Sequence, residues 1–483
     1  MPYDNDFIRR SLFAVRRRNT SARGSNGRAP HALGQALSRR SLIKGGLSSG
    51  ATLLSISRAN AASSGRIAFI NAIVFDGVSD STKSGLTVIV EDGLIADIVP
   101  ADTPIEASVK RIDCGGRTLL PGLIDAHWHC MLAPVTIGDL LTADEGYLTL
   151  LAADEAQRTL MRGFTSVRDM AGASFSLKRA IDNRMIAGPR IWPSGAIISQ
   201  SGGHGDFRLP YELPASPDSW SRTEAIGAGI VADGADAVLK RAREQLALGA
   251  SQIKLAGGGG IVSHYDPIDT SQYTEREFHA AVEAAENWGT YVAVHAYVPR
   301  AIKTALKAGV RCIEHGHLMD EETAGLIGAS GAWLSTQPFI DEGASAFAEG
   351  SANRAKELEV ENGTDRVYAL ARKLNLKVAW GTDLLFNPSA TAQQGHMLAA
   401  LKRWYQPAEI LRMATSGNAE LLALSGPRNP YPGPLGRIEK GAIADILLID
   451  GNPLENIDLI ADPGPNLRLI MKNGEIHKNT LGA

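Results

Sequence analysis

The chain has 483 residues, 44% of them hydrophobic and 21% charged, which is too long for one small core and ordinary for a globular α/β protein. Residues 1–62 hold eleven Lys/Arg against two acidic residues, so that 38 Lys/Arg stand against 50 Asp/Glu in the rest of the chain. This acidic body gives no support to nucleic-acid binding, and the expected partner is a small-molecule substrate.

Residues 1–62 have the pattern of an export signal. Ser38–Lys44 matches the twin-arginine motif, a mildly apolar stretch follows over 45–56, and Ala59–Ala61 supplies small residues for cleavage. The apolar stretch is too short to cross a bilayer of ~30 Å. We therefore predict passage through the twin-arginine export machinery, removal of residues 1–62, and a periplasmic or secreted mature protein. The alternative is a disordered basic tail that contacts membranes or nucleic acid.

Both ends of the remaining chain predict short strands with tight turns. Alternating patterns bounded by turn residues cover 66–71, 86–91, 445–451 and 467–473. We expect residues 63–118 and 430–483 to form one small composite β-sandwich domain, built from both ends of the mature chain.

Between these ends, over residues 119–429, apolar strands alternate with amphipathic helices, which predicts parallel βα units. The candidate strands are 119–127, 165–169, 190–198, 252–256, 291–295, 312–316, 333–337 and 378–382. Helical patterns cover 144–162, 235–248, 275–288 and 354–373. Eight strands with intervening helices predict a TIM (β/α)8 barrel, in which functional side chains lie at the carboxyl ends of the strands.

Three cysteines, Cys114, Cys130 and Cys312, are too few for a disulfide framework, and each lies in or beside an apolar strand pattern. We therefore expect them to be buried and free. Cys130 directly follows His129, but its side chain should point away from that histidine, so it is not a predicted metal ligand.

Ionisable side chains end five of the predicted barrel strands. The first strand ends in His127 and His129, which are two residues apart, so both imidazoles should point to one face. Later strands place four more such residues at the same end of the barrel: Lys254, His295, His315 and Asp383. A single member could be a lysine with an exposed tip, a hydrogen-bonded core histidine or a helix cap. Together they predict a metal site.

This order of H-x-H, Lys, His, His and Asp resembles the ligand pattern of the amidohydrolase superfamily in its binuclear-metal form. The lead-in Pro121–His127 and the closing segment Lys440–Asp445 match that superfamily as well. Val167–Asp169, the glycine-flanked His204 and the string His295–Tyr297 further resemble the branch that contains Xaa-Pro dipeptidases, ochratoxin-hydrolysing amidohydrolases and imidazolonepropionase-like proteins.

The resemblance implies a centre of two Zn²⁺ ions, although the same ligand types accept Mn²⁺ or Co²⁺. The first metal would be held by His127, His129 and Asp383, and the second by His295 and His315. Lys254 would bridge both metals as a carboxylated lysine, because a protonated ammonium cannot bind a cation. The metals would activate a bridging hydroxide and polarise the scissile carbonyl, and Asp383 would pass the proton of the water to the leaving nitrogen.

Three further residues are candidates for substrate binding. His204 lies in the loop after the third strand, Tyr297 lies just beyond the fifth, and His264 lies in the loop after the fourth. The resemblance implies that His204 and Tyr297 bind a free carboxylate of the substrate; the alternative is a glycine-loop histidine and a packed tyrosine. His317 could hold a metal ligand in place. The run Gly257–Gly260 predicts a flexible loop and not a phosphate-binding one, because no Gly-Lys-Ser/Thr follows.

The sequence therefore predicts an exported, metal-dependent amidohydrolase that cleaves an amide bond to an amino acid with a free carboxylate. Dipeptides of the Xaa-Pro type and N-acyl aromatic amino acids such as ochratoxin A are the expected substrates. Lys254 separates this prediction from mononuclear deaminases of the superfamily, which lack the bridging lysine. The alternatives are hydrolysis of a cyclic amide such as an imidazolone or hydantoin, a lactonase, and, outside catalysis, a metal-free scaffold or a solute-binding protein. The resemblance also implies a homo-oligomer.

Overall fold

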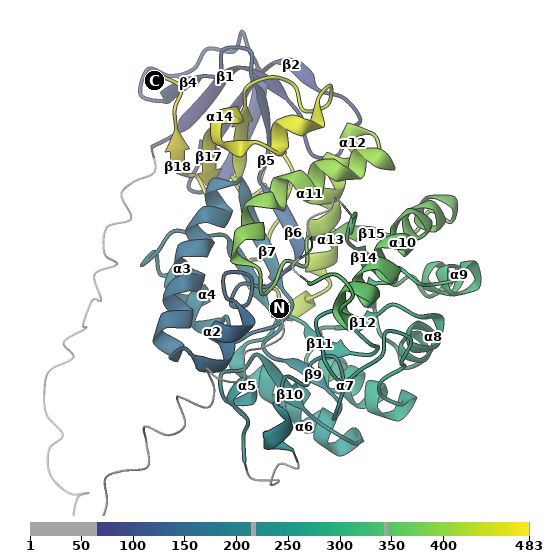
Figure 1. Ribbon diagram of the computed structural model, residues 1–483. Coiled ribbons are helices and arrows are strands. Elements are labelled where there is room, and N and C mark those ends of the chain that lie inside the picture. Colours follow the sequence, from purple (N-terminus) through teal and green to yellow (C-terminus); the bar gives the residue numbers. More distant parts are fainter. Residues whose placement is uncertain (1–64, 214–218, 342–344, 346, 483) are drawn as a thin grey trace, which may run out of the picture. The chain divides into compact units, whose positions relative to one another are not determined.

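The computed structural model describes residues 65–213, 219–341, 345 and 347–482 (Figure 1). The predicted export signal, residues 1–62, lies outside these described residues. Within the described ranges, no helix is long and apolar enough to cross a membrane.

The sequence predicts that both ends of the chain build one β-sandwich domain, and in the structure their strands are joined in one continuous mixed sheet. Its strand order is β18-β17-β16-β5-β1-β2-β3, and β4 pairs in parallel with β1. Side chains from both ends, such as Phe69 and Leu448, pack into a shared core. The bounds are Ile67–Val74 (β1), Lys83–Glu91 (β2), Leu94–Pro100 (β3), Lys110–Asp113 (β4), Thr118–Pro121 (β5), Ile446–Ile449 (β16), Leu467–Lys472 (β17) and Glu475–Asn479 (β18).

The predicted first barrel strand, 119–127, is in fact two strands in different sheets. β5 pairs with β1 and β16 and so belongs to the mixed sheet, whereas β6 (Leu123–Trp128) pairs with the barrel strand β7. Gly122 separates them, and a Cβ on this glycine would lie 2.1 Å from Thr165 Oγ1. All residues of both strands are buried, so the sequence pattern does not show where the chain changes from one sheet to the other.

The barrel strands are parallel, as predicted. They form a three-stranded sheet, β6-β7-β8, and a seven-stranded sheet, β10-β9-β11-β12-β13-β14-β15. The wall closes where β15 lies beside β6, since the Asp383 amide donates to His127 O at 2.8 Å. The further bounds are Phe164–Asp169 (β7), Arg190–Pro193 (β8), Ile197–Ser199 (β9), Gly229–Val231 (β10), Ile253–Ala256 (β11), Val292–Ala296 (β12), Cys312–His315 (β13), Trp333–Thr336 (β14) and Val378–Trp380 (β15).

The predicted third strand, 190–198, is broken. It divides into β8 and β9 at Ser194–Ala196, where Gly195 has a positive φ of 73° that favours glycine. The wall passes from one sheet to the other at this break. The short strand β10, which pairs with β9, has only three residues and was not predicted.

Helices cover the outside of the barrel (Figure 1). The four predicted helices correspond to α3, α6, α7 and α10, and their ends differ from the prediction by at most two residues. Helix α3, for example, begins after Asp144, whose carboxylate accepts from the Tyr147 amide. The helices are Ile137–Thr142 (α2), Glu145–Met161 (α3), Phe175–Asp182 (α4), Arg222–Ala225 (α5), Ala235–Leu248 (α6), Glu275–Asn287 (α7), Pro299–Lys307 (α8), Glu321–Ser330 (α9), Ala352–Lys373 (α10), Gln394–Ala400 (α11), Pro407–Arg412 (α12), Asn418–Ala423 (α13) and Pro463–Asn466 (α14).

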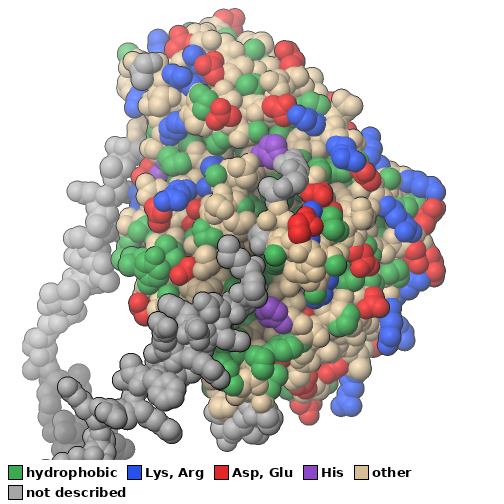
Figure 2. All heavy atoms as spheres, viewed as in Figure 1, with side chains coloured by type: hydrophobic (Ala, Val, Ile, Leu, Met, Phe, Trp, Pro, Cys, Tyr) green, Lys and Arg blue, Asp and Glu red, His purple; other side chains and the backbone are tan. Residues whose placement is uncertain are grey.

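The three cysteines are buried and free, as predicted. Cys130 packs with Trp128 in a cluster between β6 and helix α3, which confirms that it points away from the histidine pair. On the face shown in Figure 2, Lys and Arg side chains are interspersed with Asp and Glu side chains, so that this face carries no continuous basic surface.

Candidate metal centre

Three of the predicted ligands converge at one point of the barrel. His127 Nε2 lies 3.1 Å and His129 Nε2 2.8 Å from the same oxygen, Asp383 Oδ1. The three ligand atoms lie within 4.8 Å of one another. Both histidines are buried, at 1% and 4% exposure. Two imidazole nitrogens and a carboxylate oxygen facing a common point are a fitting donor set for Zn²⁺.

The other two histidines form a second group beside the first. The rings of His295 and His315 lie 4.4 Å apart, and the His315 ring lies 5.1 Å from that of His127. His295 Nε2 donates to Gly259 O at 2.9 Å, and His315 Nδ1 donates to Gln337 Oε1 at 2.7 Å. These bonds fix the tautomers and leave the opposite ring nitrogens, His295 Nδ1 and His315 Nε2, as lone-pair donors for a metal.

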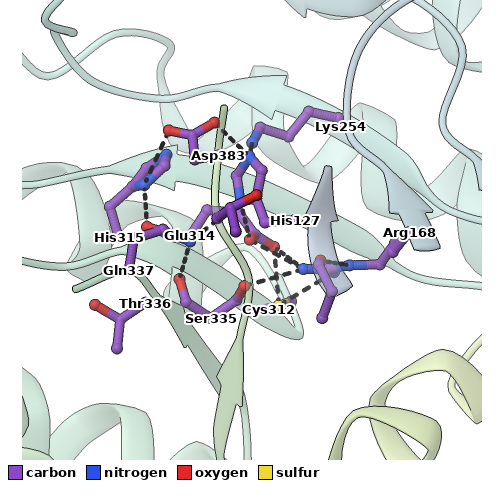
Figure 3. Close-up of polar contacts among 12 residues, drawn as sticks. His127, Arg168, Lys254, Cys312, Glu314, His315, Ser335, Thr336, Gln337 and Asp383 are labelled. Atoms are coloured by element: carbon purple, nitrogen blue, oxygen red, sulfur yellow. Dashed lines mark hydrogen bonds and ion pairs between the residues drawn. The ribbon is translucent and has the colours of Figure 1, made fainter. Parts of the chain in front are cut away.

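Lys254 projects from β11 toward the first group (Figure 3). Its side chain is 2% exposed, and Nζ lies 3.5 Å from His127 Nε2. Burial lowers the pKa of Lys254, which favours the neutral amine that carboxylation requires. The sequence therefore identified six residues that the fold brings together.

Protonation states in this pocket also suit a cation. Burial lowers the pKa of His129, His295 and His315, and neutral imidazole is the form that binds metals. Burial raises the pKa of Asp383, but His127 and the other neighbouring histidines outweigh it and hold this pKa well below its usual value. The carboxylate is thus ionised, as a ligand must be.

Two of the ligands depend on an unusual backbone. His315 has φ 77° and Asp383 has φ 57°, both in the left-handed region, which costs about 1–3 kcal/mol for such residues. In a regular strand, neighbouring side chains point to opposite faces. The positive φ turns His315 to the side that Glu314 already faces, so that both approach His127.

Glu314 and Arg168 are functional residues that the sequence reasoning did not assign. Glu314 Oε2 accepts from His127 Nδ1 at 2.8 Å, and Arg168 donates to both Glu314 oxygens at 2.8 and 3.0 Å (Figure 3). Both side chains are fully buried. Burial raises the pKa of Glu314, but Arg168 and His127 outweigh it and keep the carboxylate ionised. The signal in the sequence was an acidic residue, Glu314, in a short strand pattern that is expected to be buried.

Of the three substrate-binding candidates, His204 and Tyr297 contact the ring of a predicted ligand, and His264 is exposed on the loop between β11 and α7. The His204 ring stacks on that of His295 at 4.0 Å, and the Tyr297 ring lies 4.9 Å from His295. Tyr297 is buried, and its ring also lies 5.1 Å from that of His315. His264, by contrast, is exposed and makes no hydrogen bond with the described part of the chain. His317 Nε2 donates to Gln337 O at 2.9 Å, and the side chain of the same Gln337 accepts from the predicted ligand His315.

The glycine run after β11 is tightly packed, which corrects the prediction of a flexible loop. A Cβ on Gly259 would lie 1.9 Å from Pro267 O, and one on Gly260 would lie 1.8 Å from His204 Nδ1. A Cβ on Gly257 would lie 2.4 Å from Val294 Cγ1. Glycine is required here because other side chains and backbone approach too closely for a Cβ.

Gly381 provides a test of the closure between β15 and β6. A Cβ there would lie 2.3 Å from the His127 amide nitrogen, so Gly381→Ala must push Asp383 away from the two histidines. We expect about 100-fold lower kcat/KM, as for misplaced reacting groups, together with weaker metal binding in a metal titration. Gly325→Ala, where a Cβ meets nothing within 4 Å, is the matched control. Unchanged metal affinity in Gly381→Ala would show that this contact does not set the ligand geometry.

The chain is similar to known proteins over most of its length. A model described as "Amidohydrolase family" matches residues 118–477. An ochratoxinase from Aspergillus niger is 30% identical over 377 residues, 74% of this chain and 75% of the relative. An imidazolonepropionase from Salinispora arenicola is 25% identical over 415 residues, 81% of this chain and 92% of the relative. The structure of a prolidase complexed with N-methylphosphonate-L-proline is 33% identical with a TM-score of 0.78, and the match covers 86% of this chain and 100% of that one.

Proposed function

The chain belongs to the amidohydrolase family and is a metal-dependent hydrolase of C–N bonds, and from this premise we propose that it cleaves an amide bond to an amino acid with a free carboxylate. Xaa-Pro or other dipeptides and N-acyl aromatic amino acids of the ochratoxin type are the proposed substrates. The observation that carries the proposal is the position of His204 and Tyr297 directly against His295. The similar prolidase and ochratoxinase support the same substrate class.

We propose that the centre holds two divalent metals, Zn²⁺ by its ligand types, with Lys254 carboxylated between them. Lys254 lies against the first group through His127. Its strand, β11, pairs directly with β12, which carries His295 of the second group. A protonated Lys254 ammonium has no lone pair for a metal, whereas a carbamate at this position would add an anionic oxygen ligand.

In this proposal the chain's own residues orient the substrate and move the proton. When bound, the metals supply Lewis-acid activation of water and of the scissile carbonyl. Asp383, kept ionised by its histidine neighbours, accepts the proton of the attacking water and delivers it to the leaving nitrogen. His204 and Tyr297 hold the carboxylate end of the substrate, which fixes the amide relative to Asp383.

A hydrolysis panel tests the substrate class. Metal-replete protein is assayed with Xaa-Pro dipeptides, N-acyl-phenylalanines, ochratoxin A, cyclic amides and lactones, and each amino-acid substrate is paired with its carboxylate methyl ester. We expect His204→Ala and Tyr297→Phe to raise KM about 10–100-fold for free carboxylates, as the loss of a charge-assisted hydrogen bond does, and to leave the esters little changed. Turnover of lactones alone or of cyclic amides alone would overturn the proposed class.

Export and assembly are separate proposals that rest on the sequence. We propose that residues 1–62 direct twin-arginine export to the periplasm or beyond, and that the mature protein is a homo-oligomer. N-terminal sequencing of exported protein should begin near residue 62, and an intact Met1 in that material would contradict export by this signal. Light scattering of the purified mature protein measures the number of copies.

A further inference from the structure

We propose that Lys356 is a positioning residue that fixes His204, because it clamps the loop between β11 and α7, and that it thereby sets the affinity for the carboxylate end of the substrate. The effect on affinity rests on the proposed function. The clamp itself rests only on contacts between described residues.

The clamp is a lysine that donates to three backbone carbonyls of one loop. Lys356 Nζ lies 3.1 Å from Gly260 O, 3.0 Å from Ser263 O and 2.7 Å from Asp266 O. A lysine ammonium has three N–H donors and no acceptor, so all three donors of Lys356 bind this loop. Asn353, one turn earlier on α10, donates to Ile261 O at 2.5 Å. Helix α10 thus holds the loop through two side chains.

The clamped residues are those that hold the His204 ring. Ser263 Oγ lies 3.0 Å from His204 Nδ1 and 3.2 Å from Gly260 O, so that this hydroxyl joins the ring to the loop backbone. The ring edge lies so close to Gly260 that a Cβ there would overlap Nδ1. The opposite face stacks on His295. Lys356 therefore fixes one wall of a slot whose other wall is a proposed metal ligand.

A second path ties the loop to the His204 backbone. Asp266 Oδ2 accepts from the Gly260 amide at 2.9 Å and from Gln272 Nε2 at 3.0 Å. Gln272 Oε1 in turn accepts from the His204 amide at 2.9 Å. Asp266 and Gln272 are both buried, so these bonds are shielded from competing water.

A substitution of Lys356 should therefore act through His204. Lys356→Met keeps much of the side-chain length but removes all three donors, whereas Lys356→Arg keeps the charge in a planar fork that cannot reproduce the three bonds. Lys373→Met is the matched control, because this lysine lies on the same helix in an exposed ion pair with Glu321. Metal content should stay at the wild-type level in all three variants.

Steady-state kinetics and hydrogen exchange of the full mature protein test the proposal. We expect Lys356→Met to raise KM about tenfold for substrates with a free carboxylate, with little change in kcat or in KM for their methyl esters. In the His204→Ala background the same substitution should add nothing, because both act on one group. Amides of residues 260–266 should exchange faster in Lys356→Met than in Lys373→Met.

The outcomes separate the clamp from the proposed function. If His204→Ala fails to distinguish acids from esters, the proposed carboxylate recognition is wrong, but hydrogen exchange still tests the clamp. Unchanged exchange over residues 260–266, or additive effects of Lys356→Met and His204→Ala on KM, would overturn the positioning role. Full rescue of KM by Lys356→Arg would likewise overturn it, because charge alone would then suffice.

Discussion

Lys254→Ala should lose at least one metal equivalent and nearly all activity. The substitution removes the buried side chain that lies against His127, on the strand beside the one that carries His295. Metal activation supplies several kcal/mol of transition-state stabilisation, so kcat/KM should fall by about 1,000-fold or more. Elemental analysis after dialysis against metal-free buffer gives the metal equivalents per chain.

The control for this experiment is Lys307→Ala. Lys307 forms an exposed ion pair with Glu275, so its loss should change neither metal content nor rate. A ¹³C resonance from a carbamate, present after incubation with labelled bicarbonate in the wild-type protein and absent in Lys254→Ala, would identify the carboxylated side chain directly. A fully metallated and active Lys254→Ala protein would refute the binuclear assignment.

Glu314→Gln should destabilise the protein and weaken its metal binding together. The change leaves the guanidinium of Arg168 buried without a counter-charge, which costs about 3–5 kcal/mol of unfolding free energy. It also replaces the anion that holds His127 Nδ1, and loss of such a partner lowers metal affinity about 10–100-fold. Denaturant unfolding of the metal-free protein and a metal titration measure the two effects separately.

The double variant Arg168→Met/Glu314→Gln separates charge balance from ligand orientation. It contains no uncompensated charge, so most of the lost stability should return, but the metal affinity should stay low because the carboxylate is still missing. Glu275→Gln, in the exposed pair with Lys307, is the control and should cost less than about 1 kcal/mol. A Glu314→Gln protein with wild-type stability and affinity would show that the pair does not support the site.

The six candidate ligands could be predicted because each one follows from a local sequence pattern. His127 and His129 follow an apolar strand at a spacing of two, and Lys254, His295 and Asp383 lie in or just beyond short apolar runs. The barrel rule places the carboxyl ends of parallel strands at one edge, so residue type and strand position together were enough. The resemblance to a known superfamily then gave each residue a role.

The remainder depended on contacts between distant residues. Arg168 and Glu314 are separated by 146 positions, and nothing near either one in the sequence marks the other as its partner. The Gly257–Gly260 run was misread for the same reason, because the atoms that exclude a Cβ come from His204 and Pro267 as well as from neighbouring strands. In the sequence, Lys356 resembles an ordinary surface lysine of an amphipathic helix. Only the folded structure shows that it binds the loop after β11.

The sequence by itself determined the barrel, the order of its strands and the identity of the predicted metal ligands, because strand and helix periods and residue types are local properties of the chain. Only the tertiary structure decided that β5 belongs to the mixed sheet, that His315 and Asp383 turn into the site through left-handed backbone, and that Glu314 supports His127. These features depend on the strand register and on the pairing of buried polar groups. Packing across the whole fold determines the register and the pairing.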